Sequence, residues 1–308
     1  MTASPVSFRG RAQEAFARGV PIAIDNGARG HHEARLRASD DFPQMEAMRD
    51  QARTIRGATL ERLDHYLALF ADAVEQRGGS VFFAADAAEA NEFIVDLAAG
   101  EGVRQVVKVK SMVTEEIHLN GALEAAGIET VETDLGEFII QLAGETPSHI
   151  IAPVLHKNRF DVARLFAEEL GVDYTEEPTE LNDIARRFLR NRFLNADMGI
   201  SGVNFAVAED GAVALVTNEG NGRISTTTPR IHVALMGMER IVPTRADLAV
   251  MLEVLARSAT GQKLSVYSNI VAGPRRADEL DGPDQFHVVI VDNGRSATLG
   301  STVAEILY

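Results

Sequence analysis

Short apolar runs alternate with longer helical stretches from residue 80 to about residue 170. The runs are Val81–Ala84, Val106–Val109, Glu129–Thr133 and Ile150–Pro153. Apolar residues recur at helical spacing in the segments between most of these runs, and again after the last one. Strands that alternate with such helices form βαβ units, whose strands lie parallel. The pattern therefore predicts a parallel sheet in this half of the chain.

The residues before this region divide into two segments. Residues 45–76 carry Leu60, Leu63, Leu67 and Phe70 at the spacing of one helix face. The first 40 residues are polar and irregular in pattern. We expect residues 1–40 to form an extended N-terminal arm that packs on a neighbour or stays mobile, and residues 41–308 to form one α/β domain.

A different pattern marks the second half of the chain. Two apolar runs, Phe205–Ala208 and Ala212–Val216, flank an Asp-Gly pair, which is typical of a β-hairpin. Thr244 and Asp247 form a capping-box pattern at the start of a predicted helix. Further strands are predicted at His232–Leu235, Ser265–Ile270 and His287–Val291, and a last helix at Ala297–Leu307. Together the patterns predict an α/β fold with a mixed, mainly parallel sheet flanked by helices.

Polar residues that could bind a ligand or take part in catalysis concentrate between residues 217 and 230, directly after a predicted strand. Glycines let a ligand approach the backbone, and Arg223 and Arg230 have guanidinium groups suited to carboxylate or phosphate. Glu219 is a candidate catalytic base or nucleophile. A polar turn is the alternative interpretation. The predicted ligand-binding residues here are Asn218, Gly220, Asn221, Gly222, Arg223, Thr226, Thr227 and Arg230.

Three other segments are weaker candidates for ligand binding. Lys110 and Ser111 lie where a strand enters a helix, a place that favours anions, although a simple Ser N-cap explains them equally well. His156 and Lys157 follow another predicted strand, and a surface loop with a capping role is an equal alternative. Asn204 follows a glycine-rich stretch and is expected to point into a cleft, unless the glycines serve only close packing.

Composition excludes several classes of function. The chain has 30 Lys+Arg against 45 Asp+Glu, a net charge of -15, which disfavours nucleic acid and anionic lipid as partners. No apolar run approaches the roughly 20 residues of a membrane span. The cysteine count is 0, so this chain can supply no thiolate to zinc or iron–sulfur, and its scattered histidines predict no other metal site. Without a signal-like start, we expect a cytoplasmic protein.

Several segments together resemble one known family. They are Val107–Glu116, Glu132–Glu137, Pro147–Pro153, Gly199–Asn204, Asn218–Arg223 and Asp281–Pro283. This combination is similar to the lactate-utilization (LUD) family, specifically its LutB-type iron–sulfur members, over most of the chain from about Arg37. The resemblance implies a fold like that of the NagB/RpiA/CoA-transferase superfamily. It also implies a role in oxidising L-lactate to pyruvate, together with two partner subunits.

The resemblance also sets expectations for cofactors and for the alternatives. LutB-type proteins carry cysteine clusters after this domain, so we expect 4Fe-4S clusters in a full-length protein and no cofactor in this chain. The leading hypothesis is a domain that binds a small anionic ligand near Lys110, Asn204, Glu219, Asn221 and Arg223 and is not active alone. One alternative is an acyl-transfer or isomerase-type enzyme that uses Glu219, by analogy with CoA transferases. Another is an assembly module.

Overall fold

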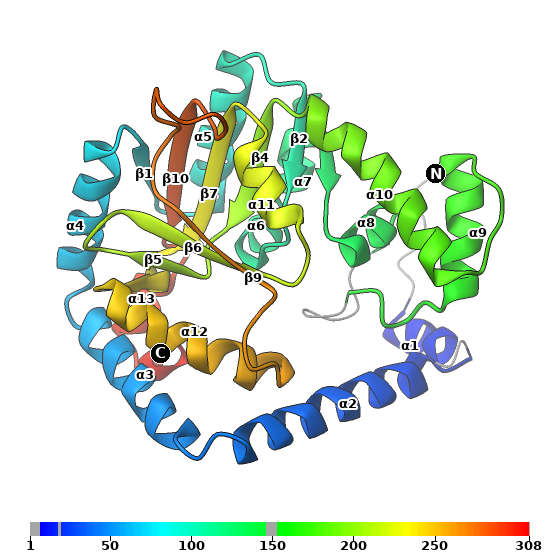
Figure 1. Cartoon of the computed structure of the whole chain (residues 1–308), viewed down its shortest axis with the longest axis horizontal. Helices are drawn as coiled ribbons and strands as arrows, with labels where there is room; N and C mark the ends of the chain where they lie inside the picture. Colours follow the sequence, from blue (N-terminus) through cyan, green and yellow to red (C-terminus); the bar gives the residue numbers. More distant parts are fainter. Residues whose placement is uncertain (1–6, 18–19, 146–152, 308) are drawn as a thin grey trace.

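The computed structural model describes residues 7–17, 20–145 and 153–307. The segment Pro147–Pro153, which contributed to the family resemblance, and the strand predicted at Ile150–Pro153 lie almost wholly outside these residues. Figure 1 shows a central twisted sheet with helices on both faces, a second smaller sheet beside it, and a long N-terminal helix along one side.

A six-stranded sheet forms the centre of the molecule, and every strand pair in it is parallel. The predicted parallel sheet is therefore confirmed. Its strands in spatial order are β1 (Ser80–Ala84), β10 (Gln285–Val291), β7 (Ile231–Gly237), β4 (Met198–Gly202), β2 (Gln105–Lys108) and β3 (Glu129–Glu132).

Helices cover both faces of this sheet, as its buried strands require. Alternate residues of β10 show the two faces: Val289 packs in one core cluster and Val288 in another. The first face is covered by α5 (Ala87–Gly100) and α7 (Leu119–Ala125), and the second by α4 (Leu63–Gln76). The helices that cover the β3 end are α8 (Leu135–Leu142), α9 (Arg159–Leu170) and α10 (Pro178–Asn195).

The antiparallel pairs belong to a separate four-stranded sheet. The predicted hairpin is confirmed as β5 (Phe205–Val207) and β6 (Ala212–Thr217), with β8 (Ile241–Val242) and β9 (Tyr267–Val271) at the two edges. At the hairpin turn Gly211 has φ +67°, and a Cβ there would lie 2.6 Å from the backbone of Val74. The turn therefore packs directly on α4, which only glycine permits.

The N-terminal segment differs from the expected extended arm. Its described residues form α1 (Phe8–Ala17) and α2 (Val20–Asp40), followed by α3 (Met45–Leu60). The end of α2 packs where α12 (Arg245–Thr260) stops, since a Cβ on Gly261 would lie 2.3 Å from the carbonyl carbon of Ala34. This tertiary contact compensates for the weak apolar pattern of residues 20–40. The domain boundary at residue 40 stays a prediction.

The chain closes with shorter elements than the sequence predicted. Instead of one helix at Ala297–Leu307, the structure has α13 (Arg295–Leu299) and a 3-10 turn, η2 (Ala304–Leu307). The capping box of Thr244 and Asp247 is present at the start of α12. No helix among the described residues has the length and apolar character needed to cross a membrane.

Candidate functional site

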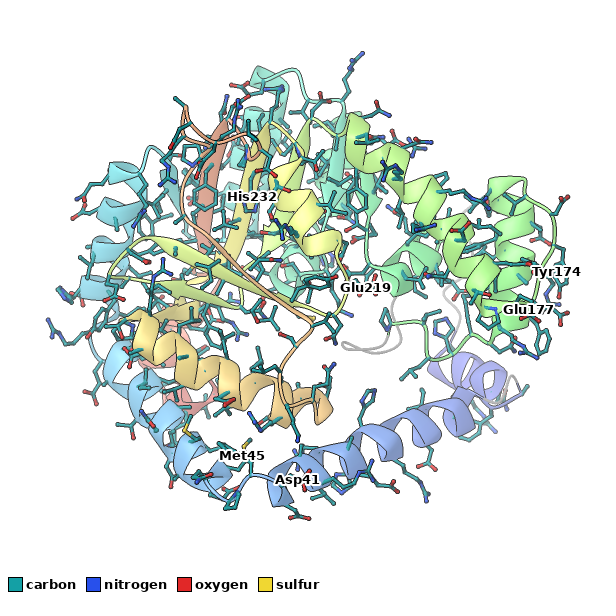
Figure 2. The ribbon with its side chains drawn as sticks, in the orientation of Figure 1. Asp41, Met45, Tyr174, Glu177, Glu219 and His232 are labelled. Carbon is teal, nitrogen blue, oxygen red and sulfur yellow. The ribbon has the colours of Figure 1, made fainter. Side chains whose placement is uncertain are left out.

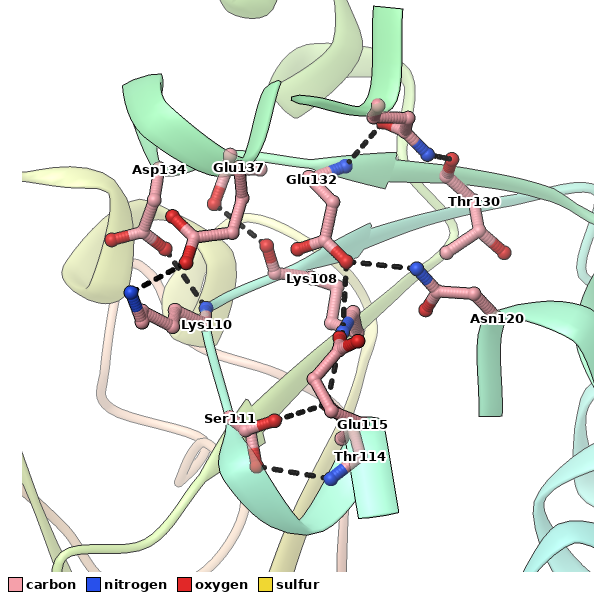
Figure 3. Close-up of polar contacts among 12 residues, drawn as sticks. Lys108, Lys110, Ser111, Thr114, Glu115, Asn120, Thr130, Glu132, Asp134 and Glu137 are labelled. Atoms are coloured by element: carbon pink, nitrogen blue, oxygen red, sulfur yellow. Dashed lines mark hydrogen bonds and ion pairs between the residues drawn. The ribbon is translucent and has the colours of Figure 1, made fainter. Parts of the chain in front are cut away.

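The carboxyl edge of the parallel sheet gathers polar side chains near β2 and β3. Figure 3 shows Lys110, Asp134 and Glu137 in contact there. The Lys110 backbone N–H donates to Asp134 Oδ2 at 2.8 Å, and Lys110 Nζ lies 2.6 Å from Glu137 Oε1. This is the edge where ligands bind in open α/β sheets.

The loop after β6 joins this edge from the second sheet. Glu219 lies in that loop, on the side that faces α8 (Figure 2), and its Oε2 accepts the Leu135 N–H at 3.2 Å. Asn221 opens α11 (Asn221–Thr227), and its Nδ2 donates to Thr133 Oγ1 at 3.2 Å. Asn221 Oδ1 is buried and has no hydrogen-bond partner among the described residues. The structure thus brings the predicted Lys110 and Glu219–Asn221 segments to one place.

The carboxyl groups of this edge hold protons more tightly than usual. The protein atoms packed around the Glu219 carboxyl, and then the negative charge of Asp134, raise its pKa, although the side chain still reaches solvent. Burial likewise raises the pKa of Asp134 and of Glu137, even though Lys110 contacts both. Glu219 is therefore suited to exchange a proton with a ligand hydroxyl. With one ammonium among three carboxyl groups, these residues alone form a poor site for an anion.

A cleft of about 830 Å³ opens beside Glu219, between α10 and the start of α11. Glu219, Asn221 and Thr133 are among its lining residues. The α10 wall carries Arg186, Arg187 and Arg190 above apolar side chains. The other lining residues are Leu135, Asn182, Ala185, Leu189, Phe193, Leu194, Gly220 and Ile224.

The three arginines that α10 contributes to the cleft were missed by the sequence interpretation. Arg186 and Arg187 both approach Asp183, at 2.6 and 3.5 Å, whereas Arg190 is exposed and has no ion pair or hydrogen bond among the described residues. Their spacing of one and four positions on an amphipathic helix could have indicated a basic stripe. What the sequence could not show is that this stripe faces Glu219.

Other predicted ligand residues hold the scaffold. Ser111 is the N-cap of α6 (Met112–Glu116), with its Oγ 3.4 Å from the Thr114 N–H. Asn204 Oδ1 accepts the Val216 N–H at 2.8 Å, and Asn218 exchanges hydrogen bonds with Gln262. The contact of Ser111 is therefore that of a helix N-cap, the alternative to ligand binding. The two asparagines tie neighbouring segments together.

The predicted ligand-binding residues within and after α11 do not lie together at the cleft. The Thr226 hydroxyl donates to the carbonyls of Gly222 and Arg223, and that of Thr227 donates to Arg223 as well. The Arg223 side chain is exposed and does not line the cleft. Arg230 lies at the opposite, amino edge of the sheet and pairs with Glu101 at 2.9 Å. A seven-residue helix, about 10 Å long, separates it from Glu219.

His156 and Lys157 form a separate group with one carboxylate. His156 Nε2 lies 2.7 Å and Lys157 Nζ 2.8 Å from the two oxygens of Glu145. Burial alone would raise the pKa of Glu145, but the hydrogen bonds from Lys157 and His156 outweigh it and lower the pKa. The contacts of this group are within itself, and neither His156 nor Lys157 lines the cleft.

A buried ion pair lies next to the polar residues at the carboxyl edge of the sheet. Lys108 is fully buried, and its Nζ lies 2.8 Å from Glu132 Oε1, 2.9 Å from Glu115 Oε1 and 2.9 Å from Thr114 Oγ1. Burial alone would lower the pKa of Lys108, but Glu132 and Glu115 outweigh it and raise the pKa. Figure 3 shows this group directly beside Lys110 and Asp134.

The residues of this chain do not fit an iron–sulfur cluster. The sequence has no cysteine to supply thiolate ligands. Across the described ranges, no three His, Asp or Glu side chains gather in a way that could hold a metal ion. Redox chemistry through such a cluster therefore cannot be assigned to any of these side chains.

Comparison with known proteins identifies relatives over nearly the whole chain. The LUD domain family matches residues 67–291. Lactate utilization protein B of Macrococcus caseolyticus is 47% identical over 293 residues, which cover 95% of this chain and 61% of that protein. The proteins of the same name from Geobacillus sp. and Anoxybacillus flavithermus are 49% and 46% identical, covering 90% and 97% of this chain and 58% and 64% of theirs. The chain thus spans about three fifths of their length.

A solved structure also shows similarity. The crystal structure of a DUF162 family protein from Deinococcus radiodurans aligns with a TM-score of 0.41 and 13% identity, covering 74% of this chain and 98% of that one.

Proposed function

Because this chain belongs to the LUD domain family, we propose that it works in lactate utilization as the ligand-binding domain of a larger protein. The observation that carries the proposal is the identity of 46–49% with proteins named Lactate utilization protein B over at least nine tenths of the chain. The cleft beside Glu219 supplies a site that matches this role in position and chemistry.

The cleft contains partners for both functional groups of a hydroxy acid. A carboxylate binds best to a guanidinium, and Arg190, which has no ion pair among the described residues, can offer one. A hydroxyl group can donate to Glu219, whose raised pKa reflects an affinity for protons. In this proposal Asn221, with its buried Oδ1 unpaired, orients a donor of the ligand.

Electron transfer lies outside these residues in the proposal. We assign it to 4Fe-4S clusters in the full-length protein, which acts with two partner subunits to oxidise L-lactate to pyruvate. Residues 1–308 offer no cysteine, so other parts of the protein would have to supply the ligands. We also place the protein in the cytoplasm, a reducing compartment with which a cysteine-free domain is compatible.

The test of lactate utilization is genetic. Deletion of the gene should abolish growth on L-lactate as sole carbon source and spare growth on pyruvate, and the intact gene should restore it. Undiminished growth of the deletion strain on L-lactate would contradict the proposal. Electron paramagnetic resonance of the intact protein tests the cluster assignment independently. A reduced sample without any iron–sulfur signal would contradict the assignment of electron transfer to 4Fe-4S clusters.

Glu219 also supports a second candidate function, an acyl-transfer or isomerase-type reaction. Its carboxyl group follows a strand and reaches solvent, as a nucleophile or base must. The raised pKa favours the role of base, because it makes the ionised carboxylate of Glu219 a stronger proton acceptor. Mass spectrometry after incubation with an acyl-CoA distinguishes a nucleophilic Glu219 from a Glu219 that acts as a base. An adduct on Glu219 that hydroxylamine removes would establish acyl transfer. The absence of an adduct would leave proton transfer as the role of Glu219.

A further inference from the structure

The cleft beside Glu219 is much larger than a three-carbon hydroxy acid. Its volume of about 830 Å³ lies within the range of roughly 300–1,000 Å³ typical of sites for drug-sized ligands. We propose that it binds an amphiphilic organic anion, with an apolar body at least the size of a fused ring and one carboxylate or phosphate group. The proposal rests on the ligand-binding role above and specifies the ligand class.

Both walls of the cleft present apolar side chains to solvent. Leu194 on α10 is 61% exposed and Ile224 on α11 is 39% exposed, and both line the cleft. On the α10 wall, Leu189 and Phe193 are buried in the core. Apolar groups that face each other across a concave surface lose their contact with water when an apolar ligand enters. A ligand with only a carboxylate and a methyl group would leave most of this surface wet.

Charge determines how such a ligand lies in the cleft. The protein carries a net charge of -15, yet the α10 wall has three arginines within five positions. Two of them are drawn to Asp183, which leaves Arg190 to bind the anionic group. Away from α10, the carboxyl group of Glu219 and the charge of nearby Asp134, which does not line the cleft, repel an anion, and Glu219 attracts a hydroxyl or amine donor. The ligand therefore has its anion at α10, its apolar body between the walls and any donor group at Glu219.

Binding of three probes to the intact protein, measured by calorimetry, tests this arrangement. They are 2-naphthoate, which has a ring body and a carboxylate, 2-naphthalenemethanol, which has the body without charge, and L-lactate. We expect 2-naphthoate to bind more tightly than either of the others. Arg190→Gln should weaken it at least about tenfold and leave 2-naphthalenemethanol unchanged. Leu194→Ser should weaken both naphthalene probes about threefold or more.

Two control variants separate a specific site from general surface effects. Arg164→Gln removes an exposed arginine of α9 that pairs with Asp161, and Leu264→Ser removes an exposed leucine; neither residue lines the cleft. Neither should change the binding of any probe. If Arg164→Gln weakens 2-naphthoate as much as Arg190→Gln does, the binding is nonspecific and the inference is overturned.

The remaining outcomes distinguish this inference from the proposed function. Binding of L-lactate without binding of 2-naphthoate would overturn the amphiphilic ligand and leave lactate utilization in place. If no probe binds and Leu194→Ser instead releases a partner subunit in a pull-down, the cleft is a protein interface and the inference fails. Loss of growth on L-lactate in the deletion strain is independent of all these results.

Discussion

Lys108 forms a buried ion pair directly beside the polar residues at the carboxyl edge of the sheet. Its side chain is fully buried, and Glu132, its closest partner, is 5% exposed. Lys108→Met leaves that carboxylate buried without its counterion, which should lower the free energy of unfolding by roughly 3–5 kcal/mol. Urea denaturation followed by circular dichroism measures the change.

Two comparisons test the cause of this loss. Lys263→Met removes an exposed lysine and should alter the free energy of unfolding by less than about 0.5 kcal/mol. Adding Glu132→Gln to Lys108→Met removes the unpaired charge and should recover part of the loss. If the double variant is as unstable as the sum of the two single variants, the pair is not the source of the effect.

Glu219 should titrate above the usual range of a glutamate, and Asp134 is part of the reason. Since a neighbouring negative charge favours the protonated form, Asp134→Asn should lower the pKa of Glu219. Carbon-13 NMR of the side-chain carboxyl groups gives this value directly. Asp173→Asn, which removes an exposed acid elsewhere, is the matched control. An unchanged or higher pKa of Glu219 in Asp134→Asn would show that the two groups do not interact.

At the residue scale, the sequence pattern singled out Glu219 and gave no indication of Arg190. Glu219 and Asn221 stood out because glycines surround them after a strand, and the structure places both at the cleft. Arg190 carries no such local signal, because its importance comes from the wall that α10 presents to α11. Arg230 looked equivalent to Arg223 in sequence, yet the length of α11 moves it to the other edge of the sheet, where it pairs with Glu101.

The packing of α11 on β4 is the element-scale feature on which the cleft depends. A Cβ on Gly199 would lie 1.8 Å from the Ser225 carbonyl oxygen, so the helix can approach the strand only over glycine. Gly199→Ala should displace α11, lower the free energy of unfolding by about 1–3 kcal/mol or more, and weaken ligand binding through Asn221. Thermal unfolding and calorimetry together measure both effects.

Gly121→Ala provides the matched control for that substitution. Gly121 lies in α7, and a Cβ there would meet nothing within 4 Å. Alanine should therefore stabilise the protein by roughly 0.5–1 kcal/mol. Equal losses of stability in the two variants would contradict the close packing of α11 on β4.

Periodicity predicted elements better than it predicted their grouping. The alternation of apolar runs and helices gave the parallel strands β1, β2 and β3, and the Asp-Gly pair gave the β5–β6 hairpin. The separation into two sheets was not visible, because it depends on contacts between distant segments such as Gly211 and α4. The helix at residues 20–40 was missed since its packing partner, the end of α12, lies more than 200 positions later.

At the scale of the whole molecule, the N-terminal helices contribute unevenly. Along α2 the described side chains before Ala38 are exposed or half-buried, whereas Ala38 is 7% exposed. Deletion of residues 1–30 should therefore shift the midpoint of thermal unfolding by less than about 2 °C. Deletion of residues 1–44 removes the buried end of α2 and should lower the midpoint further. A large shift already in the shorter deletion would show that α1 and the start of α2 belong to the folded core.

Growth on L-lactate of the deletion strain carrying Arg190→Gln tests most directly whether the cleft serves lactate utilization. We expect this variant to accumulate to the level of the intact protein and to fail to restore growth on L-lactate, while the strain grows normally on pyruvate. Arg164→Gln, with its exposed arginine on α9, should restore growth. Full restoration of growth on L-lactate by Arg190→Gln would contradict the claim that the cleft between α10 and α11 binds the ligand of this protein.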